Sequence, residues 1–515
     1  MTTPQIMIML VIAIYLGMMV IIGAIYSKQT NNVGDFYLGG RRLGPLVTAM
    51  SAEASDMSSY LLMGLPGLAY LTGIADVGWT VIGLATGTYL NWLFVAKKLR
   101  NYSAHCEAIT LPEFFSKRYR EKSHVLMAIA AIMIVIFFIP YTGSGFAACG
   151  KLFGTLFGID YHIAMIVSAI IIVGYTSLGG FNAASMTDLI QSIIMTIALI
   201  IVLVFGVKQA GGVDSVVNNA QQLNGYLNMF QTHDPATNTS SPYTLFTICS
   251  TLAWGLGYFG MPHILLRFMA IEDPKKVKTS RRVASVWVVI SMAIAVLIGV
   301  VGKAMVSNGV IDALPENQHE TIIVVISNFL ASNFGVFAAI IAGVILSGIL
   351  ASTMSTADSQ LLAASSAVSE NIFGGLFGIK LKEKTEIIIA RTVLIIIAII
   401  GVFIAWNPDS SIFKIVSFAW AGFGAVFGPV MLLALFWKRS NKYGAIAGML
   451  TGGIMVFVWK FVIAVNVPAL AVYELLPAFI IAIVVNIVVS LITPAPEKEI
   501  TDEFEEVKKL NKEMR

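Results

Sequence analysis

Long apolar runs separated by short polar breaks repeat along almost the whole chain. A membrane-spanning helix needs about 20 mostly apolar residues, and runs of that kind between breaker residues predict about thirteen spans. We place them at residues 5–26, 44–73, 78–97, 124–149, 159–179, 184–207, 243–270, 283–306, 321–370, 388–406, 411–437, 442–464 and 470–493. Two of these stretches, 44–73 and 321–370, are too long for a simple crossing, and the second should hold one span plus a flanking helix.

Composition places the chain in a membrane. Of its 515 residues, 57% are hydrophobic and only 12% are charged, whereas about 25% are charged in soluble domains. We therefore expect an all-α polytopic protein of the cell membrane, with one transmembrane domain over residues 1–495 and a tail over 496–515. The first apolar run lacks a basic segment before it and a small-residue cleavage site after it, so it should be a retained span.

Lysine and arginine gather in alternate loops. The basic segments are Lys28 with Arg41 and Arg42, residues 97–122, 275–282, 380–391 and 438–442, and the tail. Because basic loops face the cytoplasm, the N-terminus should lie outside and the C-terminus inside, as an odd number of spans requires. The net charge of +4 thus reflects topology, and nucleic-acid binding is not expected.

Two further features predict no chemistry. The tail should form a solvated cytoplasmic helix with Glu–Lys pairs four residues apart, and binding of a partner is the less favoured alternative. No obligate protein partner is evident. The three cysteines, Cys106, Cys149 and Cys249, are too scattered for a disulfide framework or a metal cluster, so we interpret them as reduced thiols without a role.

The second span carries polar groups at membrane depth. Within nine residues it holds Ser51, Glu53, Ser55, Asp56, Ser58 and Ser59, and Gly64, Pro66 and Gly67 follow. Because Gly and Pro interrupt helical hydrogen bonds, we predict a broken helix whose freed carbonyls line a wet cavity and suit a cation. A serine-rich helix packed closely against its neighbours is the alternative, and Asp56 argues against it, since an ionisable group at this depth is costly.

The seventh span is interrupted in the same way. Gly255, Gly257, Gly260 and Pro262 fall beside Trp254 and Tyr258. Interrupted spans at corresponding positions of two halves indicate a transporter with inverted repeats, here about 44–207 and 243–437. The two aromatic residues would line a substrate site or belong to the core, and their place beside the break favours the site. Half-helix N-termini at such breaks suit a substrate carboxylate.

The ninth span carries a hydroxyl face. Ser352, Ser355, Thr356 and Ser359 recur at three- and four-residue spacing, close to Asp358. Hydroxyls and carbonyls with at most one carboxylate favour Na⁺, because Ca²⁺ prefers several carboxylates and zinc prefers Cys or His. Hydroxyls bonded back to their own helix would explain two of these residues but not Asp358. Asp188, at the start of the sixth span, would either cap that helix or hold a second ion.

These segments resemble a known family. The matching stretches are FYLGGRRLGPLVTAMSAEASDMSSYLLMGLPG, LPEFFSKRYR, YTSLGGFNAASMTDLIQ, WGLGYFGMPHILLRFMA, MSTADSQLL and FAWAGFGAVFGPV. They are similar to sodium:solute symporters over residues 5–495, and in particular to the family's bacterial proline branch. The resemblance implies a LeuT-type core of five-plus-five inverted repeats with discontinuous helices, and Na⁺ carried inward together with L-proline.

The resemblance also implies roles for individual residues. The main sodium site would consist of the backbone carbonyls of Ala54, Met57 and Ser352 and the hydroxyls of Ser355 and Thr356. The substrate side would comprise Asp56, Ser58, Tyr141, Trp254, Tyr258 and Pro262, with Asp56 as the carboxylate on which transport depends. Some relatives hold a second sodium ion with the counterparts of Asp188, Ser355, Asp358 and Ser359, and Arg41 matches an arginine implicated in coupling.

The chain departs from the family's proline pattern at Glu53, Ser59, Tyr60, Met261 and Asp358. Glu53 and Asp358 add negative charge near the ion route, so the number of sodium ions stays open. Tyr60 and Met261 belong to the substrate side. Another small solute, such as a different amino acid, pantothenate or a sialic acid, therefore stays an alternative to L-proline.

Other classes of membrane protein fit less well. A primary pump needs a nucleotide site, and the chain contains no G-x-x-x-x-G-K-[ST] motif. An enzyme needs catalytic groups at membrane depth, whereas the six histidines are scattered. A channel needs a symmetric filter, and two broken helices are asymmetric. We therefore predict a secondary active transporter, not an enzyme, whose partners are Na⁺, a small solute and the lipid bilayer.

Overall fold

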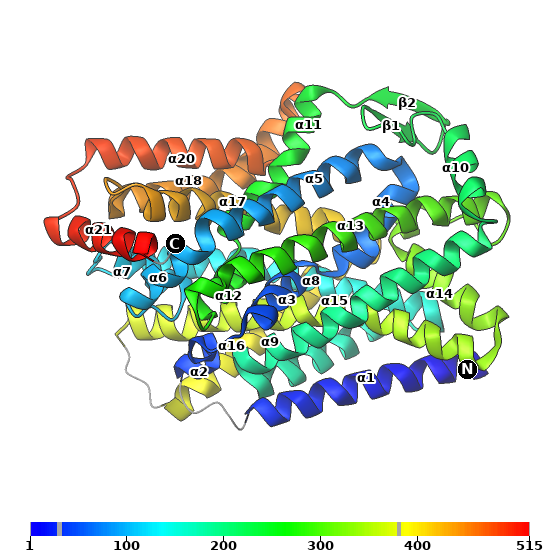
Figure 1. Ribbon diagram of the computed structural model, residues 1–515, viewed down its shortest axis with the longest axis horizontal. Helices are drawn as coiled ribbons and strands as arrows, with labels where there is room; N and C mark the ends of the chain where they lie inside the picture. Colours follow the sequence, from blue (N-terminus) through cyan, green and yellow to red (C-terminus); the bar gives the residue numbers. More distant parts are fainter. Residues whose placement is uncertain (1, 28–32, 379–382, 514–515) are drawn as a thin grey trace.

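The computed structural model describes residues 2–27, 33–378 and 383–513. Most of them lie in helices that run along the longest axis of the molecule, and the two chain ends lie at opposite ends of this bundle (Figure 1). We call the end that carries α21 (Lys498–Glu513) the tail end, and the end that carries α10 (Val213–Gln222) the hairpin end. The predicted basic positions Lys28 and Lys380 lie outside the described residues.

Eight helices of the described residues are long and apolar enough to cross a membrane. They lie in α1 (Thr3–Ser27), α8 (Val125–Phe157), the second part of α9 (Tyr161–Gln209), α13 (Val277–Ser307), α15 (Gly335–Ser366), α17 (Ile412–Phe436), α18 (Lys442–Val458) and α20 (Leu475–Ile492). Shorter apolar helices cover residues 60–72, 161–174, 245–260 and 388–404, the last within α16 (Glu383–Ile404). The predicted span 78–97 overlaps α5 (Ile74–Leu90), which is neither one of the eight long helices nor one of the shorter apolar helices. The total of thirteen spans therefore stays a prediction.

The remaining elements are short. At the tail end they are α2 (Val33–Leu38), η1 (Gly39–Arg41), η3 (Asn91–Ala96), α6 (Lys97–His105), α7 (Leu111–Arg118) and η5 (Pro274–Lys276), and η8 (Trp459–Ile463), α19 (Ala464–Asn466) and η9 (Pro468–Leu470) connect α18 to α20. The polar segment 208–242 contains α10 and an antiparallel pair of strands, β1 (Gln231–Asp234) and β2 (Thr239–Pro242). This hairpin is an exception to the predicted all-helical architecture.

The second span is broken, but not where its glycine and proline residues suggested. It forms α3 (Pro45–Asp56), the π-helical turn η2 (Tyr60–Gly64) and α4 (Leu65–Thr72). The helix is interrupted at residues 57–59, and Gly64 keeps helical angles of φ −64° and ψ −54°. Pro66 lies near the start of α4, just after the π-helical turn η2, and helical angles continue through both elements. The predicted break is therefore confirmed and its predicted position is wrong.

The seventh span is interrupted as predicted. It forms α11 (Leu245–Leu252), the 3₁₀ segment η4 (Ala253–Gly260) and, after the extended residue Met261, α12 (Pro262–Ala270). A Cβ atom at Gly257 would lie 1.9 Å from the indole nitrogen of Trp420. Only glycine therefore allows η4 to pack this closely against α17.

Two other boundaries follow the sequence pattern. The stretch 321–370 divides into α14 (Ile322–Asn333), which follows η6 (Glu316–Thr321), and α15, which continues into η7 (Ala367–Leu376). Gly335 lies between the two helices with φ +81°, so one span plus a flanking helix is confirmed. The predicted spans 159–179 and 184–207 meet at a kink in α9 at Gly180, which has φ 64°.

Helix α15 forms the centre of the bundle. It packs against α1, α8 and α9, and residues 345–365 are all buried. Outward-facing apolar side chains are exposed instead, among them Ile170 at 66%, Phe337 at 75% and Ile492 at 77%. A protein with buried polar groups inside and exposed apolar groups outside is suited to a lipid surrounding.

The tail forms a helix, as predicted, but one of its faces is buried rather than solvated. Phe504 and Val507 of α21 are 6% and 3% exposed. Asn511 accepts a hydrogen bond from Asn101 of α6 at 2.8 Å, and Arg120 forms ion pairs with Glu499 and Glu503. The helix therefore lies against the bundle at the tail end (Figure 1).

A buried carboxylate fastens the hairpin end. Glu320, in η6, accepts hydrogen bonds from the backbone N–H groups of Ile412 and Phe413 at the start of α17, both at 3.1 Å. It also pairs with Lys151 of α8 at 2.8 Å, and the two side chains are 1% and 8% exposed. The carboxylate suits the positive end of the α17 dipole. It thus joins η6, α8 and α17.

Replacing Glu320 should weaken this end of the bundle. Glu320→Ala leaves the Lys151 charge buried and two N–H groups unpaired, which we expect to cost about 3 kcal/mol or more. Thermal unfolding of the purified protein in detergent should then begin several degrees lower. Glu316→Ala, at an exposed position of the same 3₁₀ turn, is the control and should unfold like the unchanged protein. Equal unfolding temperatures for both variants would contradict the importance of the buried pair.

Candidate functional site

The backbone turns sharply where α3 ends. Met57 has φ −73° and ψ 56°, and the N–H of Ser58 donates to the carbonyl of Asp56 at 2.7 Å. This geometry is an inverse γ-turn. It ends the hydrogen-bond ladder of α3 in a fully buried region, so the carbonyls at the end of the helix need partners from other elements.

Hydroxyls of α15 face this turn. The Oγ of Ser355 donates to the carbonyl of Ala54 at 2.8 Å and lies 3.3 Å from the carbonyl of Ser352. The Oγ1 of Thr356 donates to the same Ser352 carbonyl at 3.1 Å. Four of the five oxygen groups predicted for the main sodium site thus lie together, although they come from helices far apart in the sequence. The carbonyl of Met57 belongs to the adjoining turn.

Two tyrosines hold Asp56. The hydroxyl of Tyr258 in η4 donates to Asp56 Oδ2 at 2.5 Å, and the hydroxyl of Tyr141 in α8 donates to the Asp56 carbonyl at 3.2 Å. All three side chains are at most 1% exposed. The other carboxylate oxygen, Oδ1, is buried and has no hydrogen-bond partner among the described residues. This arrangement leaves one acceptor for a cationic ligand.

Aromatic rings surround the interrupted seventh span. The ring of Trp254 lies 5.0 Å from that of Tyr473 and 6.3 Å from that of Trp420, and the ring of Tyr258 lies 5.1 Å from Trp420. The indole N–H of Trp420 donates to the Trp254 carbonyl at 2.8 Å. Sequence reasoning did not single out Trp420 and Tyr473. A signal was available for Trp420, because it lies in a stretch that matched the family.

The other predicted substrate residues lie around the same region. Ser58 and Tyr141, together with Thr356, line a narrow hollow between the end of α3, α8 and α15 that is too small to hold a water molecule. Pro262 begins α12, directly after the break in the seventh span. Ser59 lines the same hollow, whereas the ring of Tyr60 lies 6.5 Å from that of Trp254.

Glu53 points away from the candidate sodium site. Its Oε1 accepts hydrogen bonds from the hydroxyl of Thr88 at 3.0 Å and from the indole of Trp92 at 2.8 Å. The residue is completely buried between α3 and the α5–η3 helix. Its carboxyl group is therefore held by polar groups of neighbouring helices, which sequence reasoning did not foresee.

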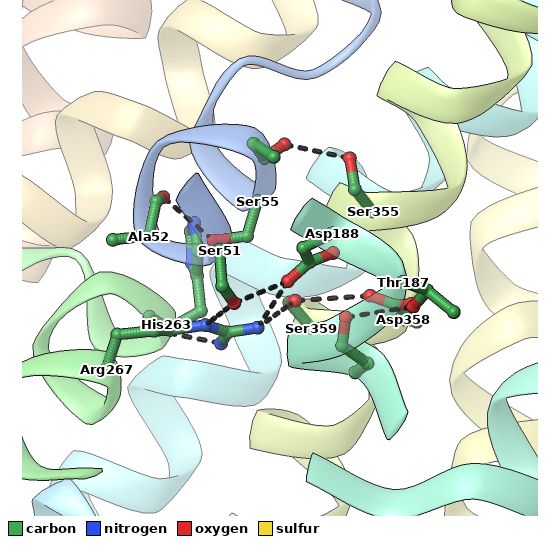
Figure 2. Close-up of polar contacts among 12 residues, drawn as sticks. Ser51, Ala52, Ser55, Thr187, Asp188, His263, Arg267, Ser355, Asp358 and Ser359 are labelled. Atoms are coloured by element: carbon green, nitrogen blue, oxygen red, sulfur yellow. Dashed lines mark hydrogen bonds and ion pairs between the residues drawn. The ribbon is translucent and has the colours of Figure 1, made fainter. Parts of the chain in front are cut away.

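The residues predicted for a second ion are in contact with an arginine. Figure 2 shows Arg267 of α12 reaching Asp188 of α9 and Ser359 of α15. Its Nη2 lies 3.1 Å from Asp188 Oδ2 and 2.5 Å from Ser359 Oγ, and its Nε donates to Ser51 Oγ at 3.0 Å. Ser51 in turn donates to Asp188 at 2.6 Å, and Ser359 donates to Asp358 at 3.1 Å. Four helices thus meet in one polar cluster.

Sequence reasoning missed Arg267. The residue lies inside the predicted span 243–270, where a buried ionisable side chain is itself a sign of function. It is 1% exposed, and Asp188 is not exposed at all. The predicted cap role of Asp188 does not describe these contacts, because both its partners are side chains of other helices.

Arg41 lies at the tail end, in η1 just before the start of α3. Its guanidinium donates to the carbonyls of Ser103, Ala108 and Met269 at 2.8, 2.6 and 2.6 Å. Burial, together with the neighbouring charge of Arg100, lowers the pKa of Arg41 to about 10. The side chain therefore keeps its charge at neutral pH and fastens η1 to the ends of α6 and α12.

The chain is similar to known transporters over nearly its whole length. It is 39% identical to the osmoregulated proline transporter of Bacillus subtilis (strain 168) over 488 residues, which cover 95% of each chain. It is 40% identical to the sodium/proline symporter of Haemophilus influenzae (strain ATCC 51907 / DSM 11121 / KW20 / Rd) over 504 residues, which cover 98% of each chain.

The fold is also known. A substrate-bound, outward-open structure of a Na⁺-coupled sialic acid symporter superposes with a TM-score of 0.78 at 17% identity, covering 96% of this chain and 99% of that one. This likeness confirms the predicted LeuT-type helical fold. The family model "Sodium:solute symporter family" matches residues 36–452. The chain therefore belongs to the sodium:solute symporter family and is a Na⁺-coupled membrane transporter, not an enzyme.

Proposed function

We propose that this protein imports L-proline together with Na⁺ by alternating access around a site at mid-membrane. The observation that carries the proposal is the similarity to two relatives named as proline transporters, at 39% and 40% identity over 95% or more of the chain. A Na⁺ ion entering across about 100 mV gains roughly 2.3 kcal/mol, enough for more than tenfold accumulation of a neutral zwitterion. Another amino acid, pantothenate or a sialic acid remains the alternative cargo.

In this proposal Na⁺ binds at the end of α3. Its ligands are the carbonyls of Ala54, Met57 and Ser352 and the hydroxyls of Ser355 and Thr356. The contacts of 2.8–3.3 Å among four of these groups support the assignment, because neutral oxygens gathered at one point suit a dehydrated monovalent cation.

Proline binds on the other side of the same turn. Its secondary ammonium group meets Asp56 Oδ1, the buried acceptor without a partner. Its ring packs against the aromatic faces of Trp254 and Tyr258, and Ser58 and Tyr141 line the adjoining hollow. Its carboxylate faces the start of α12 after Pro262, where backbone N–H groups and the helix dipole favour negative charge. Arg41 supports coupling by fastening the cytoplasmic ends of the helices.

We further propose the orientation of the chain. The tail end is cytoplasmic and the hairpin end is external, because the basic loops gather at the tail end. Residues 1–495 then form one transmembrane domain, with inverted repeats at about 44–207 and 243–437, and residues 496–515 form a cytoplasmic tail. The opposite positions of the two chain ends support this arrangement (Figure 1).

Uptake of ¹⁴C-proline into proteoliposomes tests the function. We expect accumulation that requires an inward Na⁺ gradient and falls when excess unlabelled proline is added. Ser355→Ala removes a sodium ligand and Asp56→Asn removes the negative charge, so each should lower uptake at least tenfold. Ser347→Ala, another buried hydroxyl of α15, is the matched control and should transport normally.

The outcomes separate the substrate from the site. Na⁺-driven uptake of another solute, with no uptake of proline, would overturn the substrate and keep the mechanism. Normal proline uptake by both Ser355→Ala and Asp56→Asn would overturn the site.

We propose that one Na⁺ accompanies each proline, because Arg267 takes the place of a second cation. Two of the oxygen ligands predicted for a second sodium, Asp188 and Ser359, already contact its guanidinium at 3.1 and 2.5 Å. Both charges are buried, and a buried carboxylate needs a cationic partner. Arginine supplies that partner permanently, whereas a sodium ion would leave with the cargo.

The flux ratio of ²²Na⁺ to ¹⁴C-proline tests this proposal. We expect a ratio of about one, since Arg267 already contacts Asp188 and Ser359 at the place of a second ion. Arg267→Gln exposes Asp188 to other cations and should steepen the dependence of uptake on Na⁺ concentration, while Arg267→Lys should preserve the original dependence. A ratio of two for the unchanged protein would overturn the proposal.

A further inference from the structure

A basic hollow lies between the tail helix and the membrane-spanning bundle. It has a volume of about 570 Å³ and is lined by Leu93, Phe94, Lys97, Lys98, Tyr102, Leu435, Phe436, Phe504, Val507, Lys508, Asn511 and Lys512. The residues that line it thus include four lysines and, among the described residues, no acid. One wall comes from the junction of η3 and α6, another from the end of α17, and the third from α21.

The floor of this hollow is apolar and open. Leu93, Phe94 and Phe436 are 38%, 48% and 44% exposed. The ammonium group of Lys98 lies 3.5 Å from the centre of the Phe436 ring. Aliphatic and aromatic surface beside several ammonium groups matches a ligand that is both apolar and anionic.

A second hollow extends the positive charge. It has a volume of about 550 Å³, shares Leu93 and Lys97 with the first, and is lined further by Lys275, Lys278 and Arg281. The single acid among its described lining residues is Glu513. Basic side chains therefore surround the η3–α6 junction on two sides.

The position of the hollow along the helices is that of a membrane boundary. The apolar run that begins in α5 ends at Ala96, and two lysines follow directly. The apolar helix α17 ends at Phe436, and Lys438 follows. Lipid headgroups lie at this level, with acyl chains beside the exposed apolar residues and lysines reaching toward phosphates.

We propose that the first hollow binds an anionic phospholipid, phosphatidylglycerol, from the adjacent leaflet. Its phosphate lies among Lys97, Lys98, Lys508 and Lys512, and an acyl chain runs along Leu93, Phe94 and Phe436. Charge complementarity favours this occupant over a zwitterionic lipid, because an anionic headgroup brings a net negative charge to a lining with four lysines, of which Lys508 also pairs with Glu505 at 3.0 Å. The lipid then links the tail helix to η3 and α17, in addition to the ion pair of 3.9 Å between Glu505 of α21 and Lys438 after α17.

Native mass spectrometry of the purified full-length protein tests the proposal. The protein is titrated with phosphatidylglycerol or phosphatidylcholine of identical acyl chains, and bound lipids are counted. We expect clear preference for phosphatidylglycerol. Because each lysine near a lipid surface contributes about a fivefold change in affinity, Lys508→Gln/Lys512→Gln should weaken its binding by roughly 25-fold, with little change for phosphatidylcholine.

The matched control changes the same charge on the same helix. Lys498 and Lys509 lie in α21 outside the hollow and are exposed, so Lys498→Gln/Lys509→Gln should bind phosphatidylglycerol like the unchanged protein. Phe94→Ser should weaken binding of the lipid without affecting the folding of α21, as judged by unfolding temperature.

Three results would overturn the proposal. Equal binding of both lipids by the unchanged protein would remove the headgroup preference. Equal loss in the two double variants would indicate attraction to the net charge of the tail rather than a site. Displacement of the lipid by glycerol 3-phosphate at equal concentration would assign the lysines to a soluble anion.

Discussion

The inverse γ-turn at Met57 is the constraint on which the rest of the molecule depends. A backbone that leaves the helix inside a membrane must find partners for its carbonyls. Here the hydroxyl of Ser355 donates to the carbonyl of Ala54, and the hydroxyl of Tyr141 donates to the carbonyl of Asp56. The same turn therefore fixes the groups assigned to sodium on one side and the carboxylate assigned to the substrate on the other. A ligand that orders the backbone on one side of this turn also orders the other side. This is a physical basis for coupling between two bound ligands.

Two charged side chains outside this turn, Glu320 and Arg41, connect helices at the two ends of the bundle. At the hairpin end Glu320 joins η6 and α8 to the start of α17, and at the tail end Arg41 joins η1 to α6 and α12. The groups of the candidate site are buried between these two fastenings. We infer that access from either end requires one of these sets of charge-assisted hydrogen bonds to open. Charge-assisted hydrogen bonds are strong where water is excluded, and hydrogen bonds to water can replace them. The two ends can therefore open in turn.

Local pattern predicted the helices, the two interrupted spans and the divided ninth span, because these depend on apolar run length and on Gly and Pro. It misplaced the break of the second span, since Gly64 and Pro66 stay within helical turns and the true turn lies at Met57. It placed the hydroxyl face of α15 correctly, yet it missed Arg267, because an arginine in an apolar run gains meaning only from a partner such as Asp188 in a distant helix. The buried face of α21 was missed for the same reason.

The position of α21 connects the tail to the fastening at Arg41. Helix α6 carries both contacts: Asn101 bonds to Asn511 of the tail, and Ser103 accepts from Arg41. These two residues of α6 are close in the sequence, so a shift of this helix moves both contacts. Helix α21 also resists such a shift, because its Phe504 ring lies against the guanidinium of Arg118 in α7. A tail that looks like solvated charge in the sequence is therefore part of the packing that closes the tail end of the bundle.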